Sequence, residues 1–210
     1  MVREPRNPAP ERLEPVGGGK ERARALIAKA WQARYEALQS PPTGETAFGA
    51  VMARVEADLV RACEMCKQAG AKQELSVALG KLGHVASDLD RPDKARTLFE
   101  ESVAVAREAG DPLRLAHAVR HLGQVNHRLG RLESAGRCLA EAIDLYDQAG
   151  TAHPLDHANA LRPMAVLREE TGDVAGARLM WRRAAQLYRS AGVDEGVREC
   201  EAHLSDLDGG

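Results

Sequence analysis

Apolar residues recur three and four positions apart along most of the sequence, which is the pattern of amphipathic helices. Between residues 77 and 192 this pattern occurs three times, and each copy contains two predicted helices joined by a tight turn. The copies end at Gly110, Gly150 and Gly192, each preceded by alanine, and a fourth Ala-Gly pair ends at Gly70. The spacing of these pairs is 40, 40 and 42 residues. A fixed period of this size predicts a solenoid of stacked helical repeats.

The period also predicts how the chain is divided. Prolines, a glycine triplet and many charges near the N-terminus predict a flexible arm, because such a segment buries too little apolar surface to order itself. The rest is predicted to be all-α: a right-handed α-solenoid of antiparallel helix pairs with about nine helices. The segments are a flexible arm over 1–20, a helical hairpin forming a degenerate first repeat over 21–70, regular repeats over 71–110, 111–150 and 151–192, and a capping helix over 193–210.

The turn inside each repeat is predicted from its residue types. Each first helix should end at a matched position, which is occupied by Asp90, Gly130 and Gly172. Glycine readily adopts the left-handed conformation that often follows a helix, and aspartate tolerates it better than most residues. Pro92 stands early in the following helix, where its missing N–H costs nothing.

The two ends of the predicted solenoid have their own apolar faces. The first helix, from Glu21 to Gln39, is predicted to bury a face made of Leu26, Ile27, Ala30, Trp31, Tyr35 and Leu38. The last helix has one apolar stripe and a charged opposite face, as a capping helix needs. This stripe contains Val197, Cys200, Leu204 and Leu207.

The three copies share a set of matched residues. Each copy has a Leu-Gly pair, or Met-Ala in the last copy, and an alanine twelve residues after the pair's second residue. A large residue follows four positions after this alanine, and a small residue three positions after the large one. These residues are Leu82-Gly83, Ala95, Phe99 and Ser102, then Leu122-Gly123, Ala135, Leu139 and Ala142, then Met164-Ala165, Ala177, Trp181 and Ala184. The pattern resembles the tetratricopeptide repeat (TPR) family, and the long period is similar to that of kinesin light chains and bacterial regulatory proteins of this superfamily. The small residues should let helices approach closely, and the large ones should fill the space between pairs.

Composition and charge narrow the function classes. A net charge of −2 with 29% charged residues of mixed sign gives no reason to expect nucleic acid as a partner. The first ten residues contain no apolar run, so we expect no secretory signal. No stretch approaches the ~20 apolar residues of a membrane span. The four unevenly placed cysteines fit a reducing cytoplasm better than a disulfide framework.

No sequence motif predicts catalysis or a cofactor. The Gly-Gly-Gly-Lys run at 17–20 lacks the spacing and the preceding strand of a phosphate-binding loop. Cys63 and Cys66 align with packing positions of the later repeats, which favours buried structural thiols over a redox pair or a zinc site. No nucleophile motif is present, so we expect the chain not to be an enzyme.

Two histidine pairs are the candidates for a metal site. His117 and His121 stand four residues apart on one predicted helix, as do His153 and His157. This spacing can place two imidazoles on one ion, but a competent site needs three or four ligands, and no acidic third ligand stands beside either pair. We therefore predict no metal.

The resemblance implies where a partner would bind. In this family the first helices line a concave surface, and their outward residues contact extended or helical peptides. By register these residues are Val77, Gly80, His84, Ser87 and Asp88, then His117, Arg120, Gln124, His127 and Arg128, then Asn159, Arg162, Val166, Glu169 and Glu170. The three arginines would bind the carboxylates of an acidic segment. Hydrogen bonds would come from His84, Gln124, His127 and Asn159. Histidines near their solution pKa would make binding sensitive to pH between about 6 and 8.

Three functions remain open from the sequence. The first is a non-catalytic scaffold of the bacterial cytoplasm that binds a protein or peptide in its groove. The second is a homodimer formed through the N-terminal hairpin, with Trp31 and Tyr35 as interface anchors. The third is a sensor of a small ligand or signalling peptide that regulates a separate effector chain.

Overall fold

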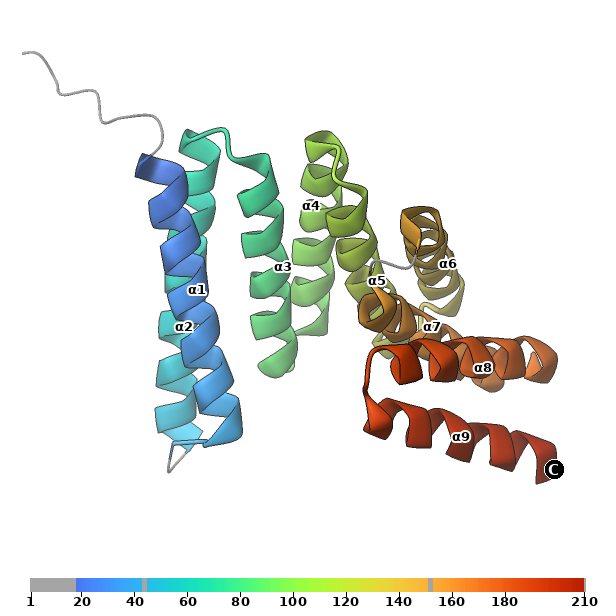
Figure 1. Ribbon diagram of the computed structural model, residues 1–210. Helices are drawn as coiled ribbons and strands as arrows, with labels where there is room; N and C mark the ends of the chain where they lie inside the picture. Colours follow the sequence, from blue (N-terminus) through green and yellow to red (C-terminus); the bar gives the residue numbers. More distant parts are fainter. Residues whose placement is uncertain (1–17, 43–44, 151–152, 210) are drawn as a thin grey trace, which may run out of the picture.

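The fold is given by a computed structural model that describes residues 18–42, 45–150 and 153–209 (Figure 1). Residues 1–17, 43–44, 151–152 and 210 lie outside the described part, so most of the predicted flexible arm falls outside it. Residues 18–20 of that arm are helical, and the first helix begins at Gly18 instead of Glu21. Lys20 reaches the Glu74 carboxylate at 3.4 Å, and this contact ties the first turn to the following repeat.

The described residues form nine helices and no strand. Consecutive helices make the most extensive contacts, and the short connections between them give a single row of antiparallel pairs. The predicted all-α solenoid is therefore confirmed. The helices are α1 Gly18–Gln39, α2 Glu45–Gln68, α3 Lys72–Asp88, α4 Pro92–Ala109, α5 Pro112–Arg128, α6 Leu132–Ala149, α7 Pro154–Glu170, α8 Val174–Ser190 and α9 Asp194–Gly209.

The predicted left-handed residues are present at the turn inside each repeat. Asp90, Gly130 and Gly172 have φ values of 52°, 69° and 79°. After Asp90 the chain turns back sharply, and the Arg91 N–H donates to the Ala86 carbonyl at 2.9 Å. This bond satisfies a carbonyl at the end of α3 that has no partner within the helix.

The small and large residues of the repeat pattern pack against each other inside a helix pair, whereas the sequence predicted that the large ones fill the space between pairs. Phe99, Leu139 and Trp181 are buried, with at most 1% of each side chain exposed. A Cβ atom added to Gly123 would lie 2.8 Å from Leu139 Cγ, closer than real Cβ contacts allow. Glycine in α3 and α5 thus lets a large side chain of the following helix fill the interface inside these two pairs.

The predicted apolar face of α1 is only partly correct. Its buried residues are Ala23, Ile27, Ala30 and Ala37. Tyr35 and Leu38 are 55% and 39% exposed, because small alanines rather than these large side chains make the contact with α2. The helix therefore packs closely against α2 and leaves two large apolar groups in solvent.

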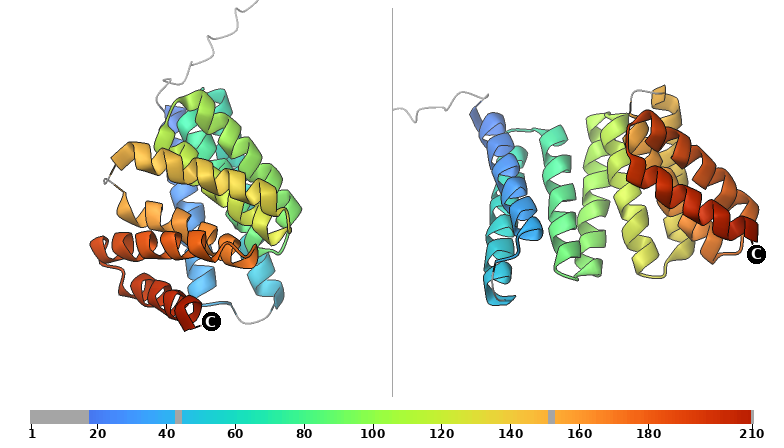
Figure 2. Two further views of the ribbon diagram at one scale, coloured as in Figure 1. Left: turned by 90° about the vertical axis from the view of Figure 1, so that its right-hand side faces the viewer. Right: turned by 60° about the horizontal axis from the view of Figure 1, so that its bottom comes forward.

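The first helices of the pairs line the inner side of a curved stack. α1 contacts α3, α3 contacts α5 and α5 contacts α7, whereas within the described residues the second helices make no comparable contacts with one another. The stack therefore curves with the odd-numbered helices on its concave surface. Figure 2 shows that it also twists, since α7 to α9 run across the direction of α1 to α4. None of the described helices is long and apolar enough to cross a membrane.

Candidate functional site

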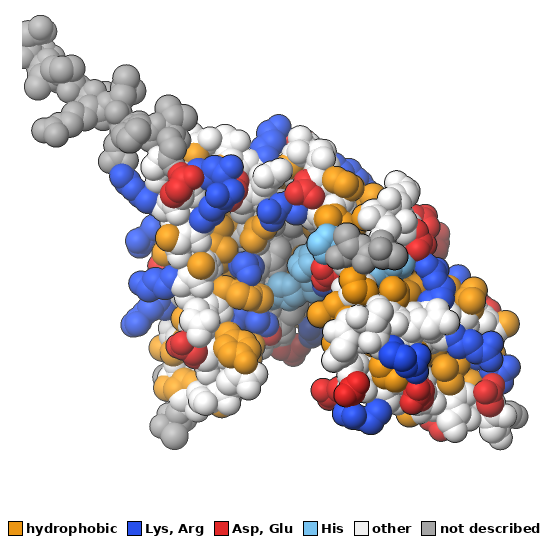
Figure 3. All heavy atoms as spheres, in the orientation of Figure 1, with side chains coloured by type: hydrophobic (Ala, Val, Ile, Leu, Met, Phe, Trp, Pro, Cys, Tyr) orange, Lys and Arg blue, Asp and Glu red, His pale blue; other side chains and the backbone are white. Residues whose placement is uncertain are grey.

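Two adjoining hollows lie on the concave surface. Figure 3 shows this surface as a recess between the N-terminal and C-terminal helices. The central hollow, of about 330 Å³, lies between α3, α5 and α7, and the N-terminal hollow, of about 410 Å³, lies between α1, α3 and α5. Val77, Lys81 and Arg114 line both, so the two hollows form one continuous surface. The central hollow is also lined by Ser76, Ser102, Leu113, His117, Ala118, Tyr146, His153 and Asp156, and the N-terminal hollow by Arg24, Ile27, Ala28, Trp31, Gln32 and Glu74.

Lys81 lies where the two hollows meet, and its ammonium group contacts an aromatic ring. Its Nζ stands 3.6 Å from the centroid of the Trp31 ring, which is a cation–π contact. No carboxylate of the described residues forms an ion pair with it. Burial, and to a smaller degree the charge of Arg34, lowers the pKa of Lys81 to about 8. Lys81 therefore brings a positive charge to the hollow that the described chain does not pair.

Trp31 connects α1 to α3 and faces this surface. The Arg34 guanidinium lies 4.3 Å from the Trp31 centroid and donates to the Asp88 carboxylate at 2.6 and 2.9 Å. The Trp31 and His84 rings are 5.6 Å apart. Trp31 is thus held among groups of the same chain, and its role as an anchor of a homodimer stays a prediction. Asp88, predicted to face a partner, is already bound by Arg34.

Three histidines from α3 and α5 form a cluster of rings beside Lys81. The centroids of His84 and His121 are 4.2 Å apart, and those of His117 and His121 are 4.6 Å apart. Phe99 lies behind them, 5.3 Å from His84 and 5.5 Å from His121. The cluster joins two neighbouring repeats at the floor of the concave surface.

These histidines are neutral at neutral pH. Burial, followed by nearby positive charges, lowers the pKa of His84 to about 3 and that of His121 well below its ordinary value. His117 is more open to the hollow, and burial with the charge of Arg120 lowers its pKa to about 4. The predicted sensitivity to pH between about 6 and 8 therefore does not arise from His84 or His117.

Arg120 is buried and is not the outward-facing cation that the repeat register predicted. Only 7% of it is exposed. Its Nη2 donates to His121 Nε2 at 3.0 Å, and the guanidinium also interacts with the Tyr146 hydroxyl on α6. His121 then donates from Nδ1 to Gln124 Oε1 at 2.8 Å. Arg120 thus holds the α5–α6 pair together and fixes the tautomer of His121.

Two of the predicted residues on α7 are paired within the chain. Arg162 binds the Glu199 carboxylate of α9 through Nε and Nη2, at 2.6 to 2.9 Å. Asn159 Oδ1 accepts a hydrogen bond from the Tyr188 hydroxyl at 2.8 Å. Neither residue lines the central or the N-terminal hollow. Both connect α7 to the helices that follow it.

A third hollow, of about 360 Å³, brings five of the predicted residues together between α3 and α5. Two of them already have charged partners: His127 Nε2 donates to Glu170 Oε2 at 2.6 Å, and Arg128 reaches Asp90 at 3.1 Å. The predicted residues that line it are His84, Ser87, Gln124, His127 and Arg128. This hollow has less unpaired charge than the surface around Lys81.

Sequence reasoning missed Lys81, although its position contains a signal. Lys81 stands four residues after Val77 and three before His84, so it shares their helix face. The repeat register predicts Val77 and His84 on the groove face, and Lys81 stands between these two positions. Arg114, Tyr146 and Asp156 were missed because helix crossing angles, which the sequence does not state, bring them to the same hollow.

The thiols and histidines offer no metal site in the described residues. Cys63 and Cys66 are buried on α2, and burial raises the pKa of Cys63 to about 12. No group of three or more His, Cys, Asp or Glu side chains in the described part of the chain is arranged to hold an ion.

The curved stack with its concave surface defines a class of protein, the helical repeat scaffolds. Residues 74–148 match the tetratricopeptide repeat family. The repeats in this segment are therefore similar to tetratricopeptide repeats, and the described helices have the fold of a TPR-like solenoid. A comparison with curated protein sequences finds no match.

Three solved structures have the same fold. BtubC (BKLC) from P. vanneervenii is 15% identical with a TM-score of 0.52, over 91% of this chain and 91% of that chain. A Podosopora anserina putative kinesin light chain with nearly identical TPR-like repeats is 11% identical with a TM-score of 0.59, over 90% and 96%. The Pyrococcus horikoshii signal transduction ATPase with numerous domains, which has a tetratricopeptide repeat sensor, is 11% identical with a TM-score of 0.51, over 88% of this chain and 31% of that one.

Proposed function

We propose that this chain is a non-catalytic scaffold that binds an extended segment of a protein partner along its concave surface. The observation that carries the proposal is Lys81, a cation at the junction of two hollows that no carboxylate of the described residues pairs. An acidic side chain of the partner would bind there. The cysteines are free thiols, which supports a reducing compartment such as the cytoplasm.

The walls around Lys81 suit a peptide that is partly apolar. Ile27, Ala28 and Val77 form the apolar part of the N-terminal hollow beside Trp31. Aromatic rings and neutral imidazoles offer flat surfaces and hydrogen bonds without competing charge. A segment that crosses both hollows would bury apolar groups and would place its carboxylate on Lys81.

The test is a charge reversal with a matched control. Immobilised wild type, Lys81→Glu and Lys67→Glu proteins are compared for capture from native lysate, since Lys67 is an exposed lysine of α2. A captured partner is then purified and titrated by calorimetry. We expect Lys81→Glu to weaken binding by at least about tenfold, because a like charge would face the acidic segment. If Lys81→Glu and Lys67→Glu bound the partner equally well, the interface would lie outside the concave surface.

Arg162→Glu distinguishes this site from the arginines that the sequence predicted. The Arg162 guanidinium is already bound by Glu199, so it has little capacity left for a partner. We expect a smaller loss of affinity for Arg162→Glu than for Lys81→Glu. A larger loss would place the acidic segment on α7.

Self-association is a second candidate, favoured by the exposure of two large apolar side chains on α1. Tyr35 and Leu38 are 55% and 39% exposed at the end of the stack. Light scattering of wild type beside Tyr35→Ser/Leu38→Ser tests it. A dimer that the double variant converts to a monomer would support this function, and a monomeric wild type would exclude it.

A further inference from the structure

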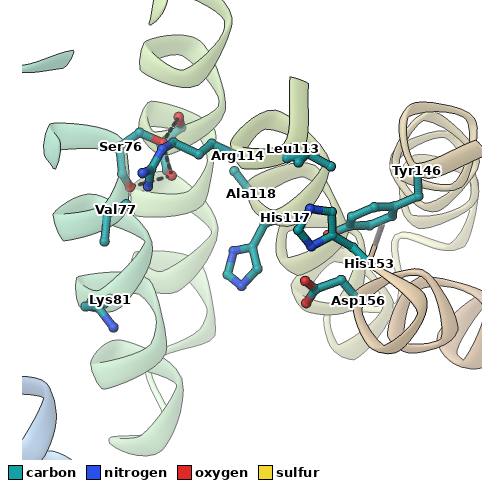
Figure 4. A pocket seen from close by; sticks show the side chains of 11 residues that line it. Ser76, Val77, Lys81, Leu113, Arg114, His117, Ala118, Tyr146, His153 and Asp156 are labelled. Carbon is teal, nitrogen blue, oxygen red and sulfur yellow. Dashed lines mark hydrogen bonds between the residues drawn. The ribbon is translucent and has the colours of Figure 1, made fainter. Parts of the chain in front are cut away.

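Two residues of opposite charge face the central hollow from different repeats. Figure 4 shows Lys81 on α3 and Asp156 on α7, with the His117 ring projecting into the space between them. The two side chains form no ion pair with each other within the described residues. Lys81 and Asp156 therefore face the hollow as two separate charges.

Asp156 has no hydrogen bond to a donor of the described residues. The Arg120 guanidinium attracts it electrostatically, but Arg120 is buried and already bonded to His121. Arg114, the other cation on this wall, lies 3.0 Å from Asp111 of its own helix turn. The Asp156 oxygens are thus available as acceptors for a donor that enters the hollow.

The surface between these two charges is neutral. His117 has a pKa of about 4, and burial raises the pKa of Tyr146 to about 12, so neither ring is charged near neutral pH. Leu113 and Ala118 add apolar contact. Charge–charge attraction is stronger beside such low-dielectric walls than in water.

We propose that the central hollow binds a dipolar peptide segment, with a carboxylate on Lys81 and a cationic side chain on Asp156. This rests on the proposed function, because it assumes that a peptide occupies the concave surface. The inference also goes beyond the proposed function, because the bound segment is then not only acidic. It carries a negative and a positive side chain a few residues apart. A hollow of about 330 Å³ accommodates only a short stretch of peptide.

The order of charges is fixed by the fold. An extended chain advances about 3.3 Å per residue, so side chains two residues apart are separated by about 7 Å and lie on the same face. A peptide that lies across α5 can thus present an acidic group to α3 and a basic group to α7.

The experiment uses four capped alanine-rich peptides of equal length. The first contains Glu and Lys, the second Glu and Gln, the third Gln and Lys, and the fourth two Gln. Each of the four peptides is made in three forms, in which the two variable residues stand two, three or four positions apart. Binding to the full chain is measured by calorimetry up to about 1 mM peptide, so that weak dissociation constants can be compared.

We expect the peptide with both charges to bind at least about tenfold more tightly than the neutral one at the best spacing. Lys81→Met should abolish the gain from Glu and leave the gain from Lys. Asp156→Asn should abolish the gain from Lys and leave the gain from Glu. Lys67→Met and Asp144→Asn, at exposed positions on α2 and α6, are the matched controls, and circular dichroism checks that every variant is folded.

A gain from Glu without any gain from Lys would overturn the dipolar site while leaving the proposed acidic partner intact. Retention of the gain from Lys in Asp156→Asn would also overturn it. If none of the peptides binds, the dipolar site is rejected, and the proposed function is judged separately by the capture experiment with Lys81→Glu.

Discussion

Gly83 of α3 packs directly against the ring of Phe99 on α4. A Cβ atom at Gly83 would lie 2.7 Å from the ring, a distance that real Cβ atoms essentially never show. Because Phe99 is 1% exposed and enclosed by both helices, the ring has no free direction in which to move. The closeness of this helix pair therefore depends on the missing methyl group.

The first prediction is that Gly83→Ala destabilises the fold. Overpacking typically costs about 1–3 kcal/mol, and alanine regains up to about 1 kcal/mol of helix propensity, so we expect a net loss of roughly 1–2 kcal/mol. Gly80→Ala is the control in the same helix, because its Cβ would meet Ser102 at an ordinary 3.5 Å. It should stabilise the protein by about 0.5–1 kcal/mol. Urea unfolding measures both, and equal effects would contradict the tight contact at Gly83.

This contact could be predicted from the sequence because the same small and large residues recur at matched positions in three copies. Gly83 and Phe99 correspond to Gly123 and Leu139, and the packing inside a helix pair depends on residues close in sequence. The left-handed Asp90 could be predicted for the same reason. Because the pattern occurs in three copies, the predicted role of each position can be compared among three repeats of the same chain.

The groove could be predicted only in outline. The repeat register identifies a helix face, but the exposure of one side chain depends on how neighbouring repeats cross. Arg120 and Lys81 illustrate this: the predicted cation is 7% exposed, and the overlooked one lies at the junction of two hollows. Arg162 was misread for a related reason, since its partner Glu199 lies on the last helix, outside the repeats.

The second prediction is a loss of stability on mild acidification. The folded pKa of His84, about 3, lies below the ordinary value of about 6.5, so the unfolded chain binds more protons below that pH. Stability should therefore fall as pH drops from about 6.5, by up to about 1.4 kcal/mol per pH unit for such a histidine. His84→Gln should reduce this slope between about pH 7 and 5, where most carboxylates remain ionised. Urea unfolding at several pH values measures it.

His153→Gln is the control for the acid slope, because His153 lies exposed on the rim of the central hollow. It shows how much of any change in the acid slope comes from replacing a histidine at all, and the slope of His84→Gln is compared with it. A His84→Gln protein with the full wild-type slope would show that His84 does not resist protonation in the folded state.

The third prediction concerns the thiols. Burial, reinforced by Cys66, raises the pKa of Cys63 to about 12, and burial raises the pKa of Cys200 to about 11. A thiol reacts as its thiolate, so these groups should be inert toward a disulfide reagent in the native protein. Cys138, which is only partly buried, should react first. Absorbance with Ellman's reagent should show a fast phase that Cys138→Ser removes, and the remaining thiols should appear only in denaturant. A fast reaction of Cys63 would revive a redox role for it.

The last prediction is that binding of the Glu-containing peptide weakens in alkaline solution. Burial lowers the pKa of Lys81 to about 8, whereas the Trp31 face favours the ammonium form and opposes this shift. Only the charged form attracts a carboxylate, so affinity should be constant below about pH 7 and should fall as pH rises above about 8. Calorimetry with the Glu peptide and its Gln counterpart, from about pH 6 to 10, measures the decline.

Two variants assign this alkaline loss to Lys81. Lys81→Arg keeps its charge throughout the range, because the guanidinium pKa exceeds about 12, so its affinity should not fall at high pH. Trp31→Leu removes the aromatic face that holds the ammonium, and the decline should begin at a lower pH than in wild type. If wild type and Lys81→Arg lost affinity together, the titrating group would lie elsewhere, and Lys81 could not be the residue that binds the carboxylate.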